Sequence, residues 1–171
     1  MNRRSILSIA AMTALGLTLV SSAAVSQQKS LKEQLFGTWT LVSNDNVAPD
    51  GSKRQLFGAN PKGILILDSG GRYALIQVRP DRPKFASNNR LQGTAEENKA
   101  AQEGAVATFG TWLVNEADKT IGLRIEGSVY PNVEGTYSQR QVISLTADEL
   151  KWLNPAAGSG GKTESVFKRT K

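Results

Sequence analysis

The sequence predicts an all-β fold: one domain built as an eight-stranded antiparallel, up-and-down β-barrel with one short helix. Three observations support this prediction. Eight segments show the apolar and polar alternation that is typical of β-strands. Short turns join nearly all of them, and one connection, between the third and fourth strands, has a helical pattern. A β-sandwich is the alternative, although eight strands suffice to close a barrel around one small ligand.

Residues 1–26 are predicted to be a signal peptide, so that residues 27–171 form the barrel domain. Arg3 and Arg4 precede an apolar run from Ile6 to Val20 and then small residues, which is the order of an export signal. The run is shorter than the roughly 20 apolar residues of a transmembrane helix. We therefore expect a periplasmic or secreted protein without a stable membrane anchor after cleavage, with an uncleaved anchor as the alternative. The arginine pair leaves the general secretory and twin-arginine routes both open.

The net charge does not indicate a nucleic-acid partner. The chain has 21 basic and 15 acidic residues, and loss of Arg3 and Arg4 with the signal peptide leaves a net charge of +4. This mild excess differs from the clustered basic charge of nucleic-acid-binding domains. We expect the partner to be a small apolar or amphipathic molecule and not a nucleic acid. The oligomeric state stays open.

The chain contains neither cysteine nor histidine, which excludes several kinds of site. Without cysteine there is no disulfide, thiol nucleophile or lipid-bearing cysteine. Without histidine there is no Ser-His-Asp triad and no His-ligated zinc or haem iron. We therefore expect no cofactor and no metal site, and we identify no catalytic residue. Any catalysis would depend on carboxylates, Lys, Tyr, Ser or a bound cofactor.

The first part of the domain is predicted to form a short amphipathic helical turn and then three strands. The turn covers residues 29–35, and the first strand, residues 36–44, places Trp39 on the face of alternate apolar residues. Asp50 and Gly51 mark a turn. Residues 63–79 form a hairpin, because two apolar, β-rich runs flank a glycine turn.

The connection after the third strand predicts the helix. Thr94 is a suitable N-cap, and Glu97, three residues later, completes a capping box. Gly104 supplies a stop signal. We expect one helix over residues 95–103.

Strand alternation then resumes to the end of the chain. A loop with the sequence AAGSGGKT, residues 156–163, resembles a P-loop, but the β-rich segment after it predicts a flexible hairpin loop because a phosphate cradle needs a helix there. The five remaining strands are expected at residues 105–115, 120–128, 136–146, 149–154 and 163–171.

Three segments carry a resemblance to a known family. The first strand, FGTWTLVS, contains a Gly-x-Trp motif; the hairpin has the sequence GILILDSGGRYAL; and the last strand ends in basic residues. Together with the connection DRPKFASNNRLQGTAEENKA, these segments resemble the bacterial lipocalin-like domain family over about residues 31–171. The resemblance implies a lipocalin-like barrel with an interior cavity, and it implies no particular activity.

The resemblance also implies how one barrel end closes. In lipocalins the Trp of this motif packs against a basic residue of the last strand. Trp39 matches the motif, Arg169 matches its partner better than Lys168, and Gly37 permits close approach. A guanidinium over an indole ring contributes roughly 0.5–2 kcal/mol. We expect these residues to have a structural role.

Two strands carry polar residues on a face that also contains apolar residues. On the third strand these are Tyr73, Gln77 and Arg79, and on the sixth they are Tyr137 and Gln139, on the same face as Ile143 and Leu145. If those faces point inward, the polar groups would orient a ligand in an apolar cavity. The alternative is that one strand has the opposite register and its polar residues face water.

The connection after the third strand adds two candidate ligand contacts. Arg82 and Arg90 lie in a basic, proline-containing stretch. They are candidates for binding the head group of a ligand at the barrel mouth. The alternative is a solvated, proline-stiffened loop that leads into the helix.

We therefore predict an exported protein that binds a small, largely apolar ligand inside the barrel. One alternative is a barrel enzyme, an isomerase, cyclase or hydrolase, which requires an inward carboxylate or tyrosine with a shifted pKa. Another is a non-catalytic envelope interaction protein, which requires an exposed apolar patch. The identity of the ligand is not predicted.

Overall fold

The computed structural model describes residues 29–171, and the predicted signal peptide lies outside the described residues. Nine strands and two α-helices form the described part of the chain, together with a 3₁₀ turn at Pro131–Val133. The helices are α1 (Leu31–Leu35) and α2 (Ala95–Glu103). The strands are β1 (Gly37–Val47), β2 (Lys53–Gln55), β3 (Lys62–Leu67), β4 (Arg72–Val78), β5 (Ala105–Asn115), β6 (Thr120–Ser128), β7 (Tyr137–Leu145), β8 (Glu149–Asn154) and β9 (Lys162–Arg169).

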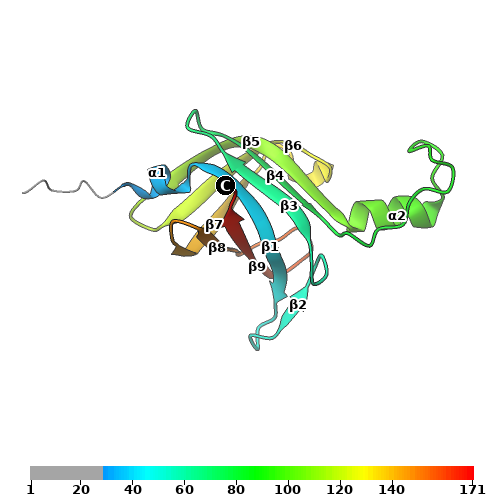
Figure 1. The fold of residues 1–171 in the computed structure, drawn as a ribbon, viewed down its shortest axis with the longest axis horizontal. Coiled ribbons are helices and arrows are strands. Elements are labelled where there is room, and N and C mark those ends of the chain that lie inside the picture. Colours follow the sequence, from blue (N-terminus) through cyan, green and yellow to red (C-terminus); the bar gives the residue numbers. More distant parts are fainter. Residues whose placement is uncertain (1–28) are drawn as a thin grey trace, which may run out of the picture.

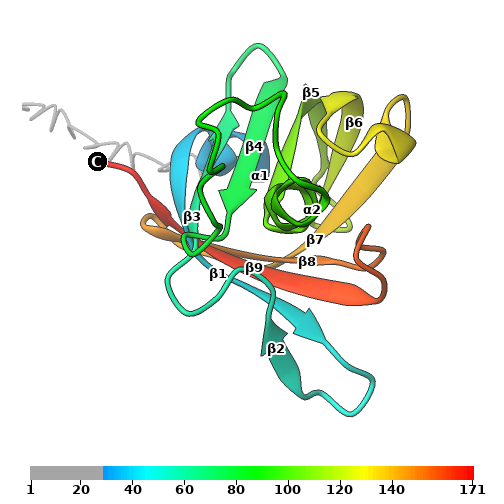
Figure 2. The same cartoon turned by 90° about the vertical axis from the view of Figure 1, so that its right-hand side faces the viewer.

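Eight of the strands close into an antiparallel barrel, as predicted. Each strand from β3 to β9 pairs with its neighbour in the chain, and β1 pairs with both β3 and β9. Figure 2 looks along the barrel from the side of α2 and shows these strands around the interior. Closure leaves no free edge among these eight strands, which removes a common route to aggregation.

The ninth strand, β2, was not predicted from the sequence. It pairs only with the far end of β1, from Asp45 opposite Gln55 to Val47 opposite Lys53. All three residues of β2 are exposed, so its sequence carries no apolar alternation to reveal a strand. Figure 2 shows β2 extending away from the barrel.

Helix α2 covers the predicted residues, but its place among the strands was counted wrongly. The capping box is present: Glu97 N donates to Thr94 Oγ1, and Thr94 N donates to Glu97 Oε2. The helix lies between β4 and β5 instead of between a third and a fourth strand, because the unpredicted β2 precedes it. No helix among residues 29–171 has the length and apolar character needed to cross a bilayer.

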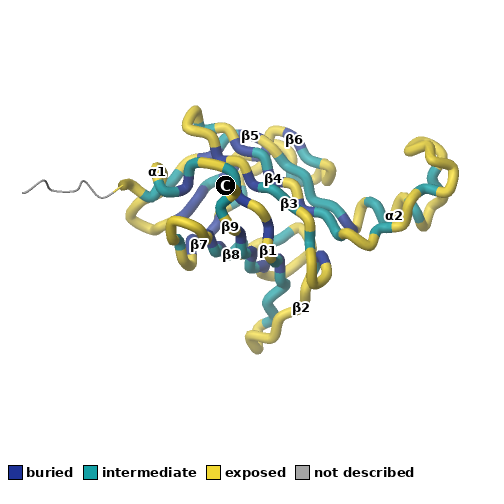
Figure 3. Tube along the Cα trace, in the orientation of Figure 1, coloured by how far each residue is buried: buried dark blue, intermediate teal, exposed yellow. Residues whose placement is uncertain are grey.

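The two helices lie at opposite ends of the barrel (Figure 1). Helix α1 also has a complete capping box, between Ser30 and Glu33, and it buries Leu35. Helix α2 buries none of its residues, and Figure 3 shows its connection as largely exposed. The two ends therefore differ: α1 covers one end, and α2 stands beside the other.

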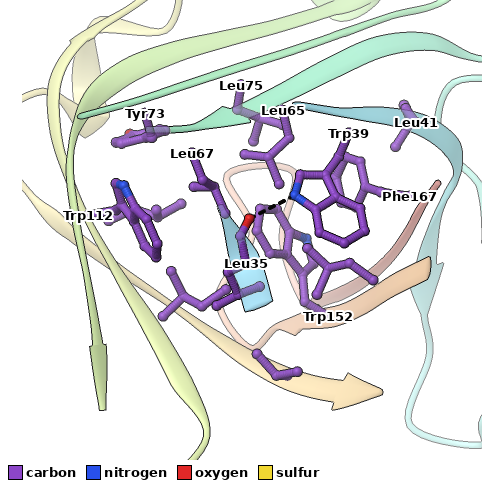
Figure 4. Close-up of a cluster of buried hydrophobic side chains, with 14 residues drawn as sticks. Leu35, Trp39, Leu41, Leu65, Leu67, Tyr73, Leu75, Trp112, Trp152 and Phe167 are labelled. Atoms are coloured by element: carbon purple, nitrogen blue, oxygen red, sulfur yellow. Dashed lines mark hydrogen bonds between the residues drawn. The ribbon is translucent and has the colours of Figure 1, made fainter. Parts of the chain in front are cut away.

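The hydrophobic core fills the half of the barrel next to α1 (Figure 4). The Trp39 indole Nε1 donates a hydrogen bond of 2.9 Å to the Leu35 carbonyl, which joins α1 to the first strand inside the core. Five of the core side chains are aromatic. The core comprises Leu35, Trp39, Leu41, Leu65, Leu67, Tyr73, Leu75, Trp112, Ile121, Leu123, Val142, Leu150, Trp152 and Phe167.

Strands β1 and β4 place the predicted apolar face inward, with one interruption. On β4, Tyr73 and Gln77 are both buried. On β1, the register against β9 shifts between Leu41 and Ser43, so one extra residue is inserted. Such a β-bulge changes which side chains point inward, and Asn44 becomes buried as a result.

Strand β7 has the opposite register to the one predicted. Tyr137 is 58% exposed and Gln139 is also exposed, whereas Arg140 and Val142 are buried. The reason is a β-bulge between Val142 and Ser144, beyond which Leu145 packs against the core. The direction of Leu145, after the bulge, therefore does not indicate which way the residues before the bulge point.

Candidate ligand-binding cavity

The barrel end next to α1 is closed by a stacked pair of side chains. The Arg169 guanidinium lies 3.9 Å from the centroid of the Trp39 ring, and the two residues are register partners on β9 and β1. Arg169 also donates three hydrogen bonds to backbone carbonyls, those of Gln34, Phe36 and Ala147. One side chain thus joins the α1 segment to the loop between β7 and β8.

Gly37 stands directly below this guanidinium. Its φ angle is +122°, and a Cβ atom at this position would lie 3.1 Å from Arg169 Nη1. The position therefore favours glycine for its backbone conformation, and a Cβ would also press against the guanidinium. These contacts join the three residues to which the sequence analysis gave a structural role.

The other half of the barrel contains a cavity of about 630 Å³. Its wall comes from β1, β2, β4 to β9, the end of α2 and the loops at the α2 end. Apolar side chains contribute much of the surface, with Leu75, Ile125 and Trp152 on the wall and Phe57 in the loop after β2. A cavity of this size is within the range of small-molecule sites.

Side-chain size explains why the core stops and the cavity begins. On β5, Val106 and Thr108 line the cavity, whereas Trp112, farther along, fills the core. On β9, Ser165 lines the cavity, and the next inward residue, Phe167, belongs to the core. Small residues at the α2 end of these strands leave space that larger side chains occupy at the α1 end.

Two amides form a buried pair on the cavity wall. Asn44 Nδ2 donates a hydrogen bond of 2.7 Å to Gln77 Oε1. Both side chains are buried, and Asn44 Oδ1 has no hydrogen-bond partner among the described residues. Buried polar atoms normally have partners, so this oxygen is available to a ligand or to water.

Arg140 places a positive charge at the inner end of the cavity. It lines the cavity from β7 and is only 8% exposed, while the next inward side chain on the strand, Val142, is in the core. Burial lowers the pKa of Arg140 to about 10, so the guanidinium stays charged at neutral pH. It lies 5.8 Å from the centroid of the Trp152 ring.

Tyr73 lies in the core next to the same inner end. Leu75, one inward position farther along β4, lines the cavity. The Tyr73 hydroxyl is buried without a hydrogen-bond partner among the described residues. Burial raises the pKa of this phenol above its ordinary value, and the neighbouring Thr108 and Arg140 oppose the rise.

The structure brings only some of the predicted ligand-binding residues together. Gln77 and Arg79 line the cavity, and Tyr73 lies just behind its inner wall. Arg79 Nη2 donates to the Leu56 carbonyl, which fixes the arginine at the rim. Tyr137 and Gln139 point away from the interior, so the expectation that they line it is wrong.

The two candidate arginines of the connection between β4 and β5, Arg82 and Arg90, do not contact the cavity. Arg82 Nε donates to the Arg79 carbonyl, and its aliphatic stem packs against Gly104. Arg90 is exposed. Neither residue lines the cavity, so the two expected head-group contacts are not part of the site that the structure defines.

Arg140 and Asn44 line the cavity but were not predicted from the sequence. The alternative register of β7, which was left open, places Ser138, Arg140 and Val142 on one inward face, so the signal for Arg140 was present. The facing of Asn44 depends on the bulge in β1, which has no clear sequence signal.

The AAGSGGKT loop forms part of the cavity rim through Ala156 to Ser159. Lys162 begins β9, so a strand and not a helix follows the loop. The arrangement lacks the helix N-terminus that a phosphate cradle requires. Among residues 29–171 there is also no cluster of three or more carboxylates able to hold a metal ion.

Together, the closed strand topology and the half-filled interior define a barrel with an internal cavity open at one end. Residues 36–167 match the family model of the lipocalin-like domain, so the chain belongs to this family, as the sequence motifs indicated. Comparison with curated protein sequences gives no significant match.

Several solved barrels are similar in fold at low sequence identity. A redesigned β-barrel is 17% identical, with a TM-score of 0.45 and coverage of 85% of this chain and 100% of the other. A redesigned barrel bound to DFHBI is 16% identical, with a TM-score of 0.42 and coverage of 82% and 100%. A bovine odorant-binding protein in complex with a selenium-containing odorant is 16% identical, with a TM-score of 0.39 and coverage of 84% and 74%.

Proposed function

We propose that the protein binds a small, largely apolar molecule inside the open half of the barrel. The observation that carries this proposal is the cavity itself, about 630 Å³ in a closed barrel whose other half is packed. Apolar walls with a few converging polar groups are the usual composition of a small-molecule site. Here the polar groups are Asn44, Gln77 and Arg140.

Native mass spectrometry of the protein purified from its own host tests whether a small molecule stays bound in the cavity. We expect the wild type to carry a defined small-molecule mass. The matched variants are Val106→Trp, which projects a large side chain into the cavity, and Ala107→Trp, which places the same side chain on the opposite face of β5. The mass should disappear in the first variant and persist in the second.

A wild-type protein that is always empty would argue against the proposal, as would equal retention by the two tryptophan variants. Trp152 gives an independent signal, because it is the only one of the three tryptophans on the described cavity wall. A ligand in the cavity should therefore change the tryptophan fluorescence of the wild type.

We also propose that residues 1–26 direct export and are removed, so that the barrel acts in the periplasm or outside the cell. The apolar run behind two arginines supports this proposal. N-terminal sequencing of the protein from its host should begin near residue 27. A full-length protein in the cytosolic fraction would contradict it.

The enzyme alternative rests on Tyr73, the inward phenol beside the cavity. Its raised pKa keeps the hydroxyl protonated at neutral pH, so it is suited to donating a proton or a hydrogen bond and not to acting as a base. Among the described cavity-lining residues, Glu103 is the one carboxylate, and it is exposed at the rim. A chemically altered molecule retained in the native mass spectrum would favour the enzyme.

The interaction alternative rests on the outer surface of β3, β4 and β5. Ile66, Ile76 and Phe109 are between 39% and 51% exposed, and Ala74 on β4 pairs with both Ile66 and Phe109. Contiguous apolar surface of this kind marks interaction sites in many proteins. Sedimentation of the wild type and Phe109→Ser will show whether this surface supports association.

A further inference from the structure

Arg140 is a buried cation without an ion-pair partner among the described residues. The salt bridges of residues 29–171 involve Lys53, Arg72, Arg79, Lys99 and Lys151 as the cations, and none includes Arg140. Removing a charge from water costs several kcal/mol unless another group compensates it. A sequence that keeps such a residue inside an apolar barrel therefore has a use for its charge.

The guanidinium is held by one of its nitrogens and leaves one edge free. Nη1 donates to Ser138 Oγ at 2.5 Å and to the Gln139 carbonyl at 2.9 Å. No described residue accepts a hydrogen bond from Nε or Nη2, and these two N–H groups point the same way. This edge has the geometry that binds both oxygens of a carboxylate.

The charge of the cavity wall as a whole also favours an anionic ligand over a cationic one. The charged residues on the cavity wall are Arg54, Arg79, Arg140 and Glu103, that is, three cations and one carboxylate. The buried Tyr73 hydroxyl has no partner and lies close enough to Arg140 for the two groups to influence each other's pKa. The phenol therefore lies beside the Arg140 site, behind the cavity wall.

We propose that the ligand is an amphipathic carboxylate whose head group binds Arg140 at the inner end of the cavity, with its apolar chain directed toward the mouth. This inference rests on the proposed function and names its ligand class. The orientation is the reverse of the one expected from Arg82 and Arg90, which would have placed the head group at the rim. The wall residues Leu75, Ile125 and Val106 then contact the chain.

The test compares two ligands with the same ten-carbon chain, decanoate and 1-decanol, by isothermal titration at pH 7.5. The variants are Arg140→Met and, as a control, Arg124→Met, which removes an exposed arginine from β6. We expect the wild type to prefer decanoate. Arg140→Met should weaken decanoate binding about 10- to 100-fold, the usual range for a hydrogen bond to a charged group, and change decanol binding less than about threefold. Arg124→Met should change neither.

The outcomes separate the two proposals. If neither ligand binds the wild type and no host molecule is retained, the proposed function fails. If decanoate and decanol bind equally well, or Arg140→Met binds decanoate as the wild type does, the carboxylate assignment fails while cavity binding stands. Tyr73→Phe should weaken decanoate binding by a smaller factor than Arg140→Met.

A second measurement needs no variant and covers the case in which Arg140→Met does not fold. Decanoate labelled with ¹³C at its carboxyl carbon is titrated with acid in the presence of the wild type. A carboxylate on a guanidinium stays ionised to a lower pH than the free acid. A bound signal that titrates at the same pH as free decanoate would overturn the assignment.

Discussion

Two arginines of the barrel, Arg169 and Arg140, are compensated in different chemical ways. At the α1 end, Arg169 satisfies three backbone carbonyls and stacks on Trp39, so its charge is compensated by oriented dipoles and by an aromatic face. At the inner end of the cavity, Arg140 has two acceptors on one nitrogen only. The first arginine closes the fold, and the second is available to a ligand.

Arg140→Met should stabilise the ligand-free protein. The folded-state pKa of about 10 lies well below the ordinary value of an arginine, so the unfolded state holds the proton more tightly. The free-energy cost of burying the charged Arg140 is fully present below pH 10, and it disappears as the pH rises past the pKa of this side chain in the unfolded state. We expect the midpoint of thermal unfolding to rise by about 3–8 °C at pH 7.5, for a gain of about 1–3 kcal/mol.

The control for this prediction is Arg124→Met, which should shift the midpoint by no more than about 1 °C, since exposed charges contribute little. A lower midpoint in Arg140→Met would show that the contacts with Ser138, Gln139 and Trp152 outweigh the cost of burying the charge. Such a result would give the arginine a structural role.

Gly37→Ala should destabilise the closed end more than the same change at Gly51. Both glycines have positive φ angles, but a Cβ at Gly37 would lie 3.1 Å from Arg169 Nη1, whereas nothing lies within 4 Å of one at Gly51. The backbone cost is about 1–3 kcal/mol for a residue with positive φ, and it is larger at Gly37, whose φ of +122° lies farther from the left-handed region than the +83° of Gly51. Both the backbone and the contact with Arg169 therefore predict a larger loss in the free energy of unfolding, measured with urea, at Gly37. Equal losses would contradict both expectations.

At the scale of elements, the two α-helices use the same local signal for different purposes. Each begins with a capping box, Ser30 with Glu33 in α1 and Thr94 with Glu97 in α2. Helix α1 carries Leu35 into the core, and α2 buries no residue. Identical capping chemistry is therefore coupled to the barrel in one case and nearly independent of it in the other.

Ser30→Ala should lower the global stability, whereas Thr94→Ala should melt α2 locally. Loss of an N-cap costs about 0.5–2 kcal/mol of helix stability. Because the Leu35 carbonyl accepts from the Trp39 indole, the loss in α1 is transmitted to the barrel. Thermal unfolding should respond to Ser30→Ala, and amide exchange within α2 should respond to Thr94→Ala with little change in the unfolding midpoint. The reverse pattern would contradict the assignment of α1 as the covering element.

At the scale of the whole molecule, one closed sheet contains a packed half and a hollow half. We expect amide exchange to be slowest in β1 and β9 near Trp39 and Phe167, where the core is complete, and faster around the cavity. Adding decanoate should slow exchange at the cavity end and leave the α1 end unchanged. Uniform protection along the barrel would show that the cavity has no effect on local stability.

Much of the fold follows from local patterns. The alternation in residues 63–79, the capping box at Thr94 and the motif at Trp39 each depend on neighbouring residues, so they can be interpreted without tertiary information. Strand β2 was not predicted, because its three residues are all exposed and show no alternation of apolar and polar side chains. The candidate site was predicted only in part, since Gln77 and Arg79 lie on the wall but Tyr137 and Gln139 do not.

The sequence by itself determined an all-β domain of antiparallel strands, the residues that form helix α2, and the absence of thiol and imidazole side chains. They follow from the alternation of apolar and polar residues, from the capping box at Thr94 and from the amino-acid composition. Only the tertiary structure decided which face of β7 points inward, and hence that Arg140 and not Gln139 meets the cavity. The reason is physical: a β-bulge exchanges the two faces of a strand, and it is fixed by pairing with β8 and not by the residues of β7 alone.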